Sequence, residues 1–245
     1  MSNKVQNPNQ GGSKAFLWAL VAVVVVAIAV VAYIVINGQG AKTEFVAERE
    51  YENISISATL DEDKVTLEAE DGAAADADVV QLYEDFSCSY CALLAENTDD
   101  DMRADIESGD LVVEVYSLNF LDRGNAEGHS TRSLAAILAV ADSGDSDLYW
   151  NYRTLLLEEQ DNVLNQWTND DFADAAGHMG AESSVVDAIR NGDNTQRAID
   201  MATGNAELLN EQTGSVSSPR VLQDGQDLPV DDINQWIEYL RAQRA

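Results

Sequence analysis

The sequence predicts an α/β domain with a long helical insertion, preceded by one apolar helix. Three observations lead to this prediction. The run from Ala15 to Ile36 holds 22 residues without a charge, a glycine or a proline. Further along, two β-rich runs flank a helical segment at 88–107, in strand–helix–strand order. A helical stretch over about 126–212 then separates this unit from a last β-rich segment and a closing helix.

The apolar run is predicted to anchor the chain in a membrane. A 22-residue helix spans about 33 Å, which is enough to cross a bilayer core. The run is longer than the apolar core of a signal peptide, and no A-x-A site follows it. A buried soluble helix is the alternative, but such helices seldom run this far without a polar residue. We therefore expect a tail at 1–14, a transmembrane anchor at 15–36 and a juxtamembrane linker at 37–53.

The orientation of this anchor rests on few charges. Lys4 and Lys14 precede the span, and Lys42 and Arg49 follow it, so the count of positive residues ties. Lys14 abuts the apolar run directly, which favours a cytoplasmic N-terminus.

The remaining residues, 54–245, are predicted to form one domain. The strand–helix–strand order requires a crossover, so the two strands around the helix should be parallel neighbours. In the helical insertion, apolar residues recur at i, i+3, i+4 and i+7. The Asp224-Gly225 pair indicates a hairpin turn near the end. The predicted strands are 54–58, 64–67, 78–83, 111–116 and 218–222, and the closing helix carries Ile233, Trp236, Ile237 and Leu240.

Charge and cysteine content exclude several classes of protein. The chain has 44 Asp+Glu against 14 Lys+Arg, a net charge of −30. Such a surface argues against nucleic acid as a partner, because phosphate binding needs clustered cations. It suits high salt, where repulsion is screened, and it also aids solubility. Two cysteines form neither a disulfide-stapled small fold nor a four-cysteine zinc site.

Both cysteines lie in the sequence Cys88-Ser89-Tyr90-Cys91. Cys88 comes directly after a strand and opens a helix. Its sulfur should therefore face the unpaired N–H groups and positive end of that helix, which favours the thiolate. Cys91 lies one turn later and deeper in the fold. We therefore predict Cys88 as the nucleophile and Cys91 as the resolving thiol, with no cofactor beyond this redox-active pair.

Other uses of the two cysteines have less support. Zinc would need two more ligands, and the only histidines, His129 and His178, lack finger spacing. These histidines are expected on the surface or in loops. A purely structural disulfide would close a very small loop and stabilise little. Haem attachment needs a histidine where Ala92 stands. The run 99–101, three aspartates, is expected on a solvated helix face.

The residues around the dithiol resemble a known family. Residues 84–91, EDFSCSYC, resemble the D-F-x-C-P-x-C signature of DsbA-like thioredoxin-fold disulfide oxidoreductases, and 214–221 resemble that family's cis-proline segment. Residues 118–123 and 130–133 resemble membrane-anchored members found in actinobacteria, and 147–152 resemble a helix of the inserted subdomain. The resemblance covers about 64–243. It implies a thioredoxin fold with an inserted helical subdomain, preceded by one transmembrane helix.

The resemblance also implies a substrate-binding loop. Pro219 would be cis and would face the dithiol, and the Ser218 backbone would pair with an extended substrate strand. The other interpretation of Pro219 is an ordinary edge-strand or turn proline. In this family-specific context we expect substrate contacts at Ser218 and Pro219.

The sequence departs from the family pattern near the dithiol. Ser89 replaces the usual proline, and Tyr90 replaces the histidine of strongly oxidising members. Both residues are therefore expected to tune the dithiol. Glu84 and Asp85 add negative charge, which should raise the pKa of the Cys88 thiol. Together these departures predict a weaker oxidant.

The function that the resemblance implies is the introduction of disulfides into exported proteins by thiol–disulfide exchange. A membrane partner of the DsbB or vitamin K epoxide reductase type would re-oxidise the dithiol. Since oxidation requires an oxidising compartment, 37–245 should lie outside the cytoplasmic membrane. Two alternatives stay open. One is a reductase or isomerase of the same fold, and the other is a non-catalytic, membrane-anchored acidic binding domain. The redox potential of the dithiol distinguishes an oxidase from a reductase or isomerase. Trapped substrate adducts distinguish an enzyme from a binding domain.

Overall fold

The computed structural model describes residues 17–29 and 42–244. It divides into two units, Met1–Lys42 and Thr43–Ala245. In the first unit, 17–29 are helical. The tail at 1–14 and both ends of the predicted span, at 15–16 and 30–36, lie outside the described residues. Within the described ranges, no helix has the length and apolar character that a membrane crossing needs.

The second unit is built on a six-stranded sheet with the order β1-β2-β4-β3-β5-β6. The predicted strand–helix–strand unit is confirmed, since β3 and β4 pair in parallel with Leu82 opposite Val115. All other neighbours pair antiparallel. The strands are β1 Ile56–Leu60, β2 Val65–Ala69, β3 Asp78–Glu84, β4 Leu111–Ser117, β5 Arg220–Gln223 and β6 Gln226–Asp227.

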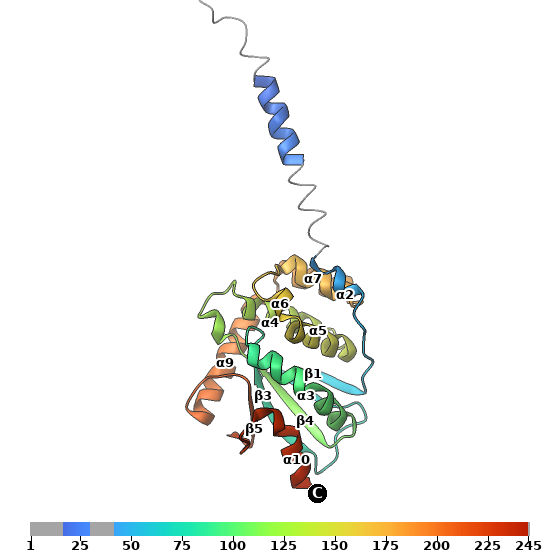
Figure 1. Ribbon diagram of the computed structural model, residues 1–245, viewed down its shortest axis with the longest axis vertical. Coiled ribbons are helices and arrows are strands. Elements are labelled where there is room, and N and C mark those ends of the chain that lie inside the picture. Colours follow the sequence, from blue (N-terminus) through green and yellow to red (C-terminus); the bar gives the residue numbers. More distant parts are fainter. Residues whose placement is uncertain (1–16, 30–41, 245) are drawn as a thin grey trace, which may run out of the picture. The chain divides into compact units, whose positions relative to one another are not determined.

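Helices cover both faces of this sheet, because successive side chains of a strand point to opposite faces. On one face, α3 (Ser89–Glu107) packs its buried Met102 against the core, with α10 (Trp236–Arg244) beside it (Figure 1). The buried Trp236 donates from Nε1 to Thr98 on α3 at 3.2 Å. On the other face, Tyr83 and neighbouring residues form a smaller apolar cluster with α9 (Thr195–Thr213).

The insertion between β4 and β5 is helical, as the sequence predicts. Side-chain caps set where two of its helices begin. Asp145 accepts from Leu148 N at the start of α5, and Thr168 and Asp171 form a capping box at the start of α7. In chain order, the helices of the insertion are η2 Phe120–Asp122, α4 His129–Asp142, α5 Ser146–Glu158, α6 Gln160–Val163, α7 Asn169–His178, α8 Ser183–Asn191 and α9. Figure 1 shows α4, α5, α6 and α7 gathered at one end of the sheet, with α9 running along its side.

The prediction of a linker at 37–53 is wrong for residues 43–53, which the structure describes. A short helix, α2 (Glu44–Ala47), lies in it, and the compact unit begins at Thr43. The physical reason is that two apolar residues stand in an otherwise polar stretch. Val46 is buried in the main core, and the Phe45 ring lies 6.3 Å from the Trp167 ring.

Polar contacts hold the rest of this segment on the insertion. Arg49 forms ion pairs with Glu158 and Glu159. The Glu52 backbone N–H donates to the Asn151 side chain at 2.9 Å, and Asn151 donates back to the Glu52 carbonyl at 2.8 Å. Residues 43–53 are therefore part of the domain, and we call them the N-terminal strap.

Candidate active site

The dithiol lies where β3 gives way to α3. A tight turn follows β3, in which Cys88 N donates to Asp85 O at 2.9 Å. Cys88 is the N-cap residue of α3, with extended backbone angles of φ −88° and ψ 112°. Its carbonyl accepts from the backbone N–H groups of Cys91 and Ala92, at 3.0 and 3.2 Å. This geometry places the Cys88 sulfur at the first turn of α3, where the backbone N–H groups of Tyr90 and Cys91 act on it.

The two thiols are both buried and unbridged, but they differ in acidity. A hydrogen bond from the Cys91 thiol, together with the Ser218 side chain and the backbone N–H groups of Cys91 and Tyr90, outweighs burial. Together they lower the pKa of Cys88 from 9.0 to about 5. Burial raises the pKa of Cys91 well above 9.0, and the neighbouring Cys88 sulfur adds to this rise. At neutral pH Cys88 is therefore a thiolate and Cys91 a thiol.

A proline loop faces the sulfur of Cys88. The Ser218–Pro219 peptide bond is cis, as the resemblance implies. The Cys88 Sγ lies 3.4 Å from the Ser218 carbonyl oxygen. Pro219 also lines a small cavity together with Cys91. The loop directly precedes β5, whose pairing with β3 brings 218–219 beside the dithiol.

The expected rise in the pKa of Cys88 from nearby carboxylates is wrong. The Glu84 carboxylate is buried and accepts from Arg153 Nε and Nη2, at 2.9 and 2.6 Å. The same guanidinium donates to Asp99 at 2.7 Å. The negative charge of Glu84 is therefore met by Arg153, and the hydrogen bonds to the Cys88 sulfur set its acidity.

Asp85 is the second of these carboxylates. It is fully buried and accepts hydrogen bonds from Ser130 Oγ at 2.5 Å, Ser87 N at 2.9 Å and Leu121 N at 3.3 Å. Burial raises its pKa to about 6, against these hydrogen bonds. Its backbone N–H lies 3.5 Å from the Cys91 sulfur. Asp85 thus ties the turn before the dithiol to the start of α4.

Two further expectations about polar residues are wrong. Asp99 is buried with Arg153 and is not on a solvated face, because α5 packs against that side of α3. His129 is buried in the first turn of α4, with its ring 5.8 Å from the Phe172 ring. Burial lowers the pKa of His129 to about 4, so the imidazole is neutral. Helix packing buries both residues in a way that local sequence does not reveal.

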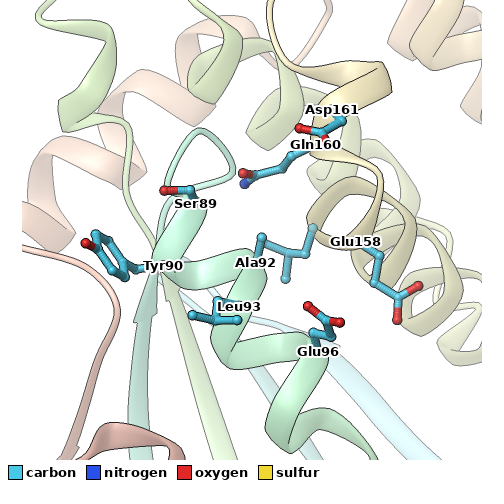
Figure 2. A pocket seen from close by; sticks show the side chains of 9 residues that line it. Ser89, Tyr90, Ala92, Leu93, Glu96, Glu158, Gln160 and Asp161 are labelled. Carbon is cyan, nitrogen blue, oxygen red and sulfur yellow. The ribbon is translucent and has the colours of Figure 1, made fainter.

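Ser89 and Tyr90, the residues between the cysteines, both have exposed side chains. Tyr90 is 70% exposed, and Figure 2 shows its ring directed away from Gln160 and Asp161 of the insertion. The contribution of Tyr90 to the Cys88 thiolate comes from its backbone N–H.

Two hollows adjoin this first turn of α3. One, of about 710 Å³, lies between α3 and the α5–α6 segment and includes Glu96, Glu158 and Asp161 (Figure 2). The other, of about 470 Å³, lies between α3, the proline loop and residues 230–234. Tyr90 and Leu93 line both hollows. The first turn of α3 therefore separates the two hollows.

Sequence reasoning missed two residues that support the site, Arg153 and Gln160. The sequence offered a clue to Arg153, because an arginine within a run of Leu, Tyr and Trp residues is expected to be buried and paired with an acid. It offered none for Gln160, because its contact with the dithiol turn joins positions 72 residues apart. In the part of the chain that the structure describes, no group of three or more His, Cys, Asp or Glu side chains is placed to hold a metal ion.

A dithiol at a helix N-terminus after a central strand, opposite a cis-proline, together with a helical insertion, defines the DsbA-like class of the thioredoxin fold. A family model described as thioredoxin matches residues 71–237. The chain therefore belongs to the thioredoxin family, and its DsbA-like character is confirmed by solved structures.

The structure is similar to MdbA, a thiol-disulfide oxidoreductase from Corynebacterium diphtheriae. The TM-score is 0.76 and the identity 43%, over 79% of this chain and 98% of that one. MdbA from Corynebacterium matruchotii is 34% identical with a TM-score of 0.74, over 82% and 98% of the two chains. DsbA from Mycobacterium tuberculosis, at 16% identity and a TM-score of 0.55, shares the fold.

Curated relatives match a shorter stretch. The serine/threonine-protein kinase PknE of Mycobacterium tuberculosis is 26% identical over 143 residues, which is 56% of this chain. The chain spans about a quarter of the length of these curated relatives.

Proposed function

We propose that this protein is an extracytoplasmic thiol-disulfide oxidoreductase that introduces disulfides into exported proteins through Cys88 and Cys91. The observation that carries the proposal is the unequal acidity of the two thiols. The Cys88 thiolate is stabilised at the start of α3, whereas Cys91 is buried as a thiol. Stabilising the thiolate favours the reduced dithiol over the disulfide, which makes the disulfide form an oxidant.

The reaction begins from the oxidised enzyme. A substrate thiolate attacks the Cys88 sulfur, so a substrate–Cys88 bond forms and the Cys88–Cys91 bond breaks. Cys91 leaves as the thiolate and takes up a proton, which its raised pKa favours. A second substrate thiolate then attacks the substrate sulfur of the mixed disulfide, and Cys88 leaves. Two electrons pass from the substrate to the enzyme, and the low pKa of Cys88 makes it a good leaving group.

Substrate binding follows from the same geometry. The Ser218 carbonyl faces Cys88 at 3.4 Å, and the next residue, Pro219, has no N–H. An extended substrate segment can pair with the Ser218 backbone while its cysteine reaches the Cys88 sulfur. Ser218 and Pro219 then act as the substrate-binding loop. The exposed side chains of Tyr90 and Leu93 lie beside the path of this segment.

We further propose that residues 15–36 anchor the protein in the cell membrane, with the N-terminus cytoplasmic and the domain outside. The support is the 22-residue apolar run and the exposure of its side chains, such as Trp18 and Ile28, in the helix at 17–29. A membrane protein of the DsbB or vitamin K epoxide reductase type would re-oxidise the dithiol. Cell fractionation with protease treatment of intact cells tests the anchor. Recovery of the protein in the cytosol would refute it.

Trapping of substrates tests the enzymatic proposal. In the Cys91→Ala variant the Cys88 thiolate attacks a disulfide of a substrate protein, so a Cys88–substrate bond forms and the other substrate sulfur leaves as a thiolate. This mixed disulfide persists, because no Cys91 thiol is present to attack the Cys88 sulfur. We expect disulfide-linked adducts with exported proteins that disappear on reduction, and none in a Cys88→Ala control. Absence of adducts from Cys91→Ala would refute catalysis and favour a binding domain.

A redox titration tests the direction of exchange. The dithiol is equilibrated with mixtures of reduced and oxidised glutathione, and the reduced fraction is measured. We expect a potential more oxidising than that of glutathione. A potential as low as that of cytosolic reductants would instead identify a reductase.

A further inference from the structure

Gln160 connects the helical insertion to the dithiol. It is the first residue of α6, and only 7% of it is exposed. Its Nε2 donates to the Phe86 carbonyl at 2.8 Å and to the Cys88 carbonyl at 3.1 Å. In Figure 2 its side chain runs from α6 toward the turn that precedes α3. One amide group therefore fixes two carbonyls of the segment that carries the nucleophile.

The two carbonyls lie on either side of Ser87, so their common donor restrains the whole turn. The Cys88 carbonyl is also the first acceptor of α3. Holding it in place sets the direction in which the Cys88 side chain leaves the backbone. The Cys91 thiol and the backbone N–H groups of the first helical turn act on the Cys88 sulfur as hydrogen-bond donors. Hydrogen bonds weaken steeply as their geometry departs from linear, so a small rotation of this turn would weaken several of them at once.

The surroundings of α6 favour a rigid support. Glu158 and Glu159, which immediately precede Gln160, are ion-paired with Arg49 of the N-terminal strap. Val163, at the other end of α6, is fully buried in the core. Gln160 is thus anchored on both sides.

We propose that Gln160 is a positioning residue of the dithiol, which holds the Phe86–Cys88 turn so that the Cys88 sulfur meets its hydrogen-bond donors. The proposal rests on the proposed function only in assigning redox chemistry to Cys88. It makes the helical insertion, and not the sheet alone, a determinant of how reactive the nucleophile is.

The test compares Gln160→Ala and Gln160→Met with a matched control, Gln166→Ala. Gln166 lies on the same connecting segment, is exposed, and donates to the Asp161 carbonyl at 2.7 Å. In the reduced full-length proteins, formation of the Cys88 thiolate is followed by ultraviolet absorbance against pH. The equilibrium constant with glutathione is measured on the same samples.

We expect both Gln160 variants to raise the Cys88 titration midpoint by about one pH unit, since a hydrogen-bond rearrangement of this kind shifts an equilibrium about tenfold. The dithiol–disulfide equilibrium should move about tenfold toward the disulfide, and Gln166→Ala should change neither value. Gln160→Met keeps the side-chain length but supplies neither a hydrogen-bond donor nor a charge, so it decides between the outcomes if Gln160→Ala does not fold.

Loss of stability in the Gln160 variants with unchanged thiol titration and glutathione equilibrium would overturn the proposal, because Gln160 would then be purely structural. Failure of the proposed function would give a different result. A protein that never forms substrate adducts but still shows the shifted Cys88 titration would refute the enzyme while supporting the positioning role.

Discussion

The hydrogen bond from the Cys91 thiol is the largest stabiliser of the Cys88 thiolate. The Cys91→Ala variant removes this donor and leaves the Ser218 contact and the backbone N–H groups in place. A hydrogen bond to a charged group contributes about 1.5–3 kcal/mol, and one pKa unit corresponds to about 1.4 kcal/mol. We therefore expect the pKa of Cys88 to rise from about 5 by about one to two units.

The assay is the ultraviolet absorbance of the thiolate in reduced protein, titrated with acid. Cys91→Ser restores a hydroxyl donor at the same place and should give a midpoint between those of the wild type and Cys91→Ala. Cys88→Ala, which lacks the titrating thiol, supplies the baseline. An unchanged midpoint in Cys91→Ala would refute the reasoning and leave the helix N-terminus as the main source of acidity.

Three further predictions concern stability. Arg153→Met leaves Glu84 and Asp99 buried without a cation and should cost about 3–5 kcal/mol in denaturant unfolding; a loss below about 1 kcal/mol would contradict the buried ion cluster. Because the folded pKa of Asp85 is raised from 3.8 to about 6, its carboxyl favours the folded state below 3.8 and loses this contribution as pH rises through 6. From acid to neutral pH, the free energy of unfolding of Asp85→Asn should therefore rise by about 1–3 kcal/mol relative to that of the wild type. If the difference in unfolding free energy between the two proteins does not change with pH, Asp85 does not titrate in this range. Finally, the net charge of −30 predicts a thermal midpoint that rises with salt, and a salt-independent midpoint would show that self-repulsion is minor.

Local pattern predicted the sheet and its first helix closely. The predicted strand at 78–83 and helix at 88–107 compare with β3 Asp78–Glu84 and α3 Ser89–Glu107. These elements are long and consistently β-rich or helical, and the dithiol stands at their junction. Alternation of buried residues and the position of the turn are properties of neighbouring residues, so they are readable from sequence.

The surroundings of the dithiol were not predictable in the same way. Glu84 adds negative charge in the sequence, but in the fold Arg153, which lies 69 positions away, meets it. Asp99 was assigned to solvent because the helix carries three consecutive aspartates, yet α5 covers the first of them. Such pairings depend on how the insertion docks on α3, and no periodicity in a single sequence specifies that docking.

The N-terminal strap has a practical consequence for producing the domain. A recombinant protein that begins at residue 54, where the first strand was predicted, would lack a core side chain, Val46. It would also leave Glu158 and Glu159 without Arg49 on the segment that carries Gln160. Truncation at residue 54 would therefore change the surroundings of the dithiol. The pKa of Cys88 measured on such a fragment would differ from that of the intact domain. A fragment that starts at Thr43 retains these contacts, so the choice of first residue becomes an experimental variable for the chemistry of Cys88.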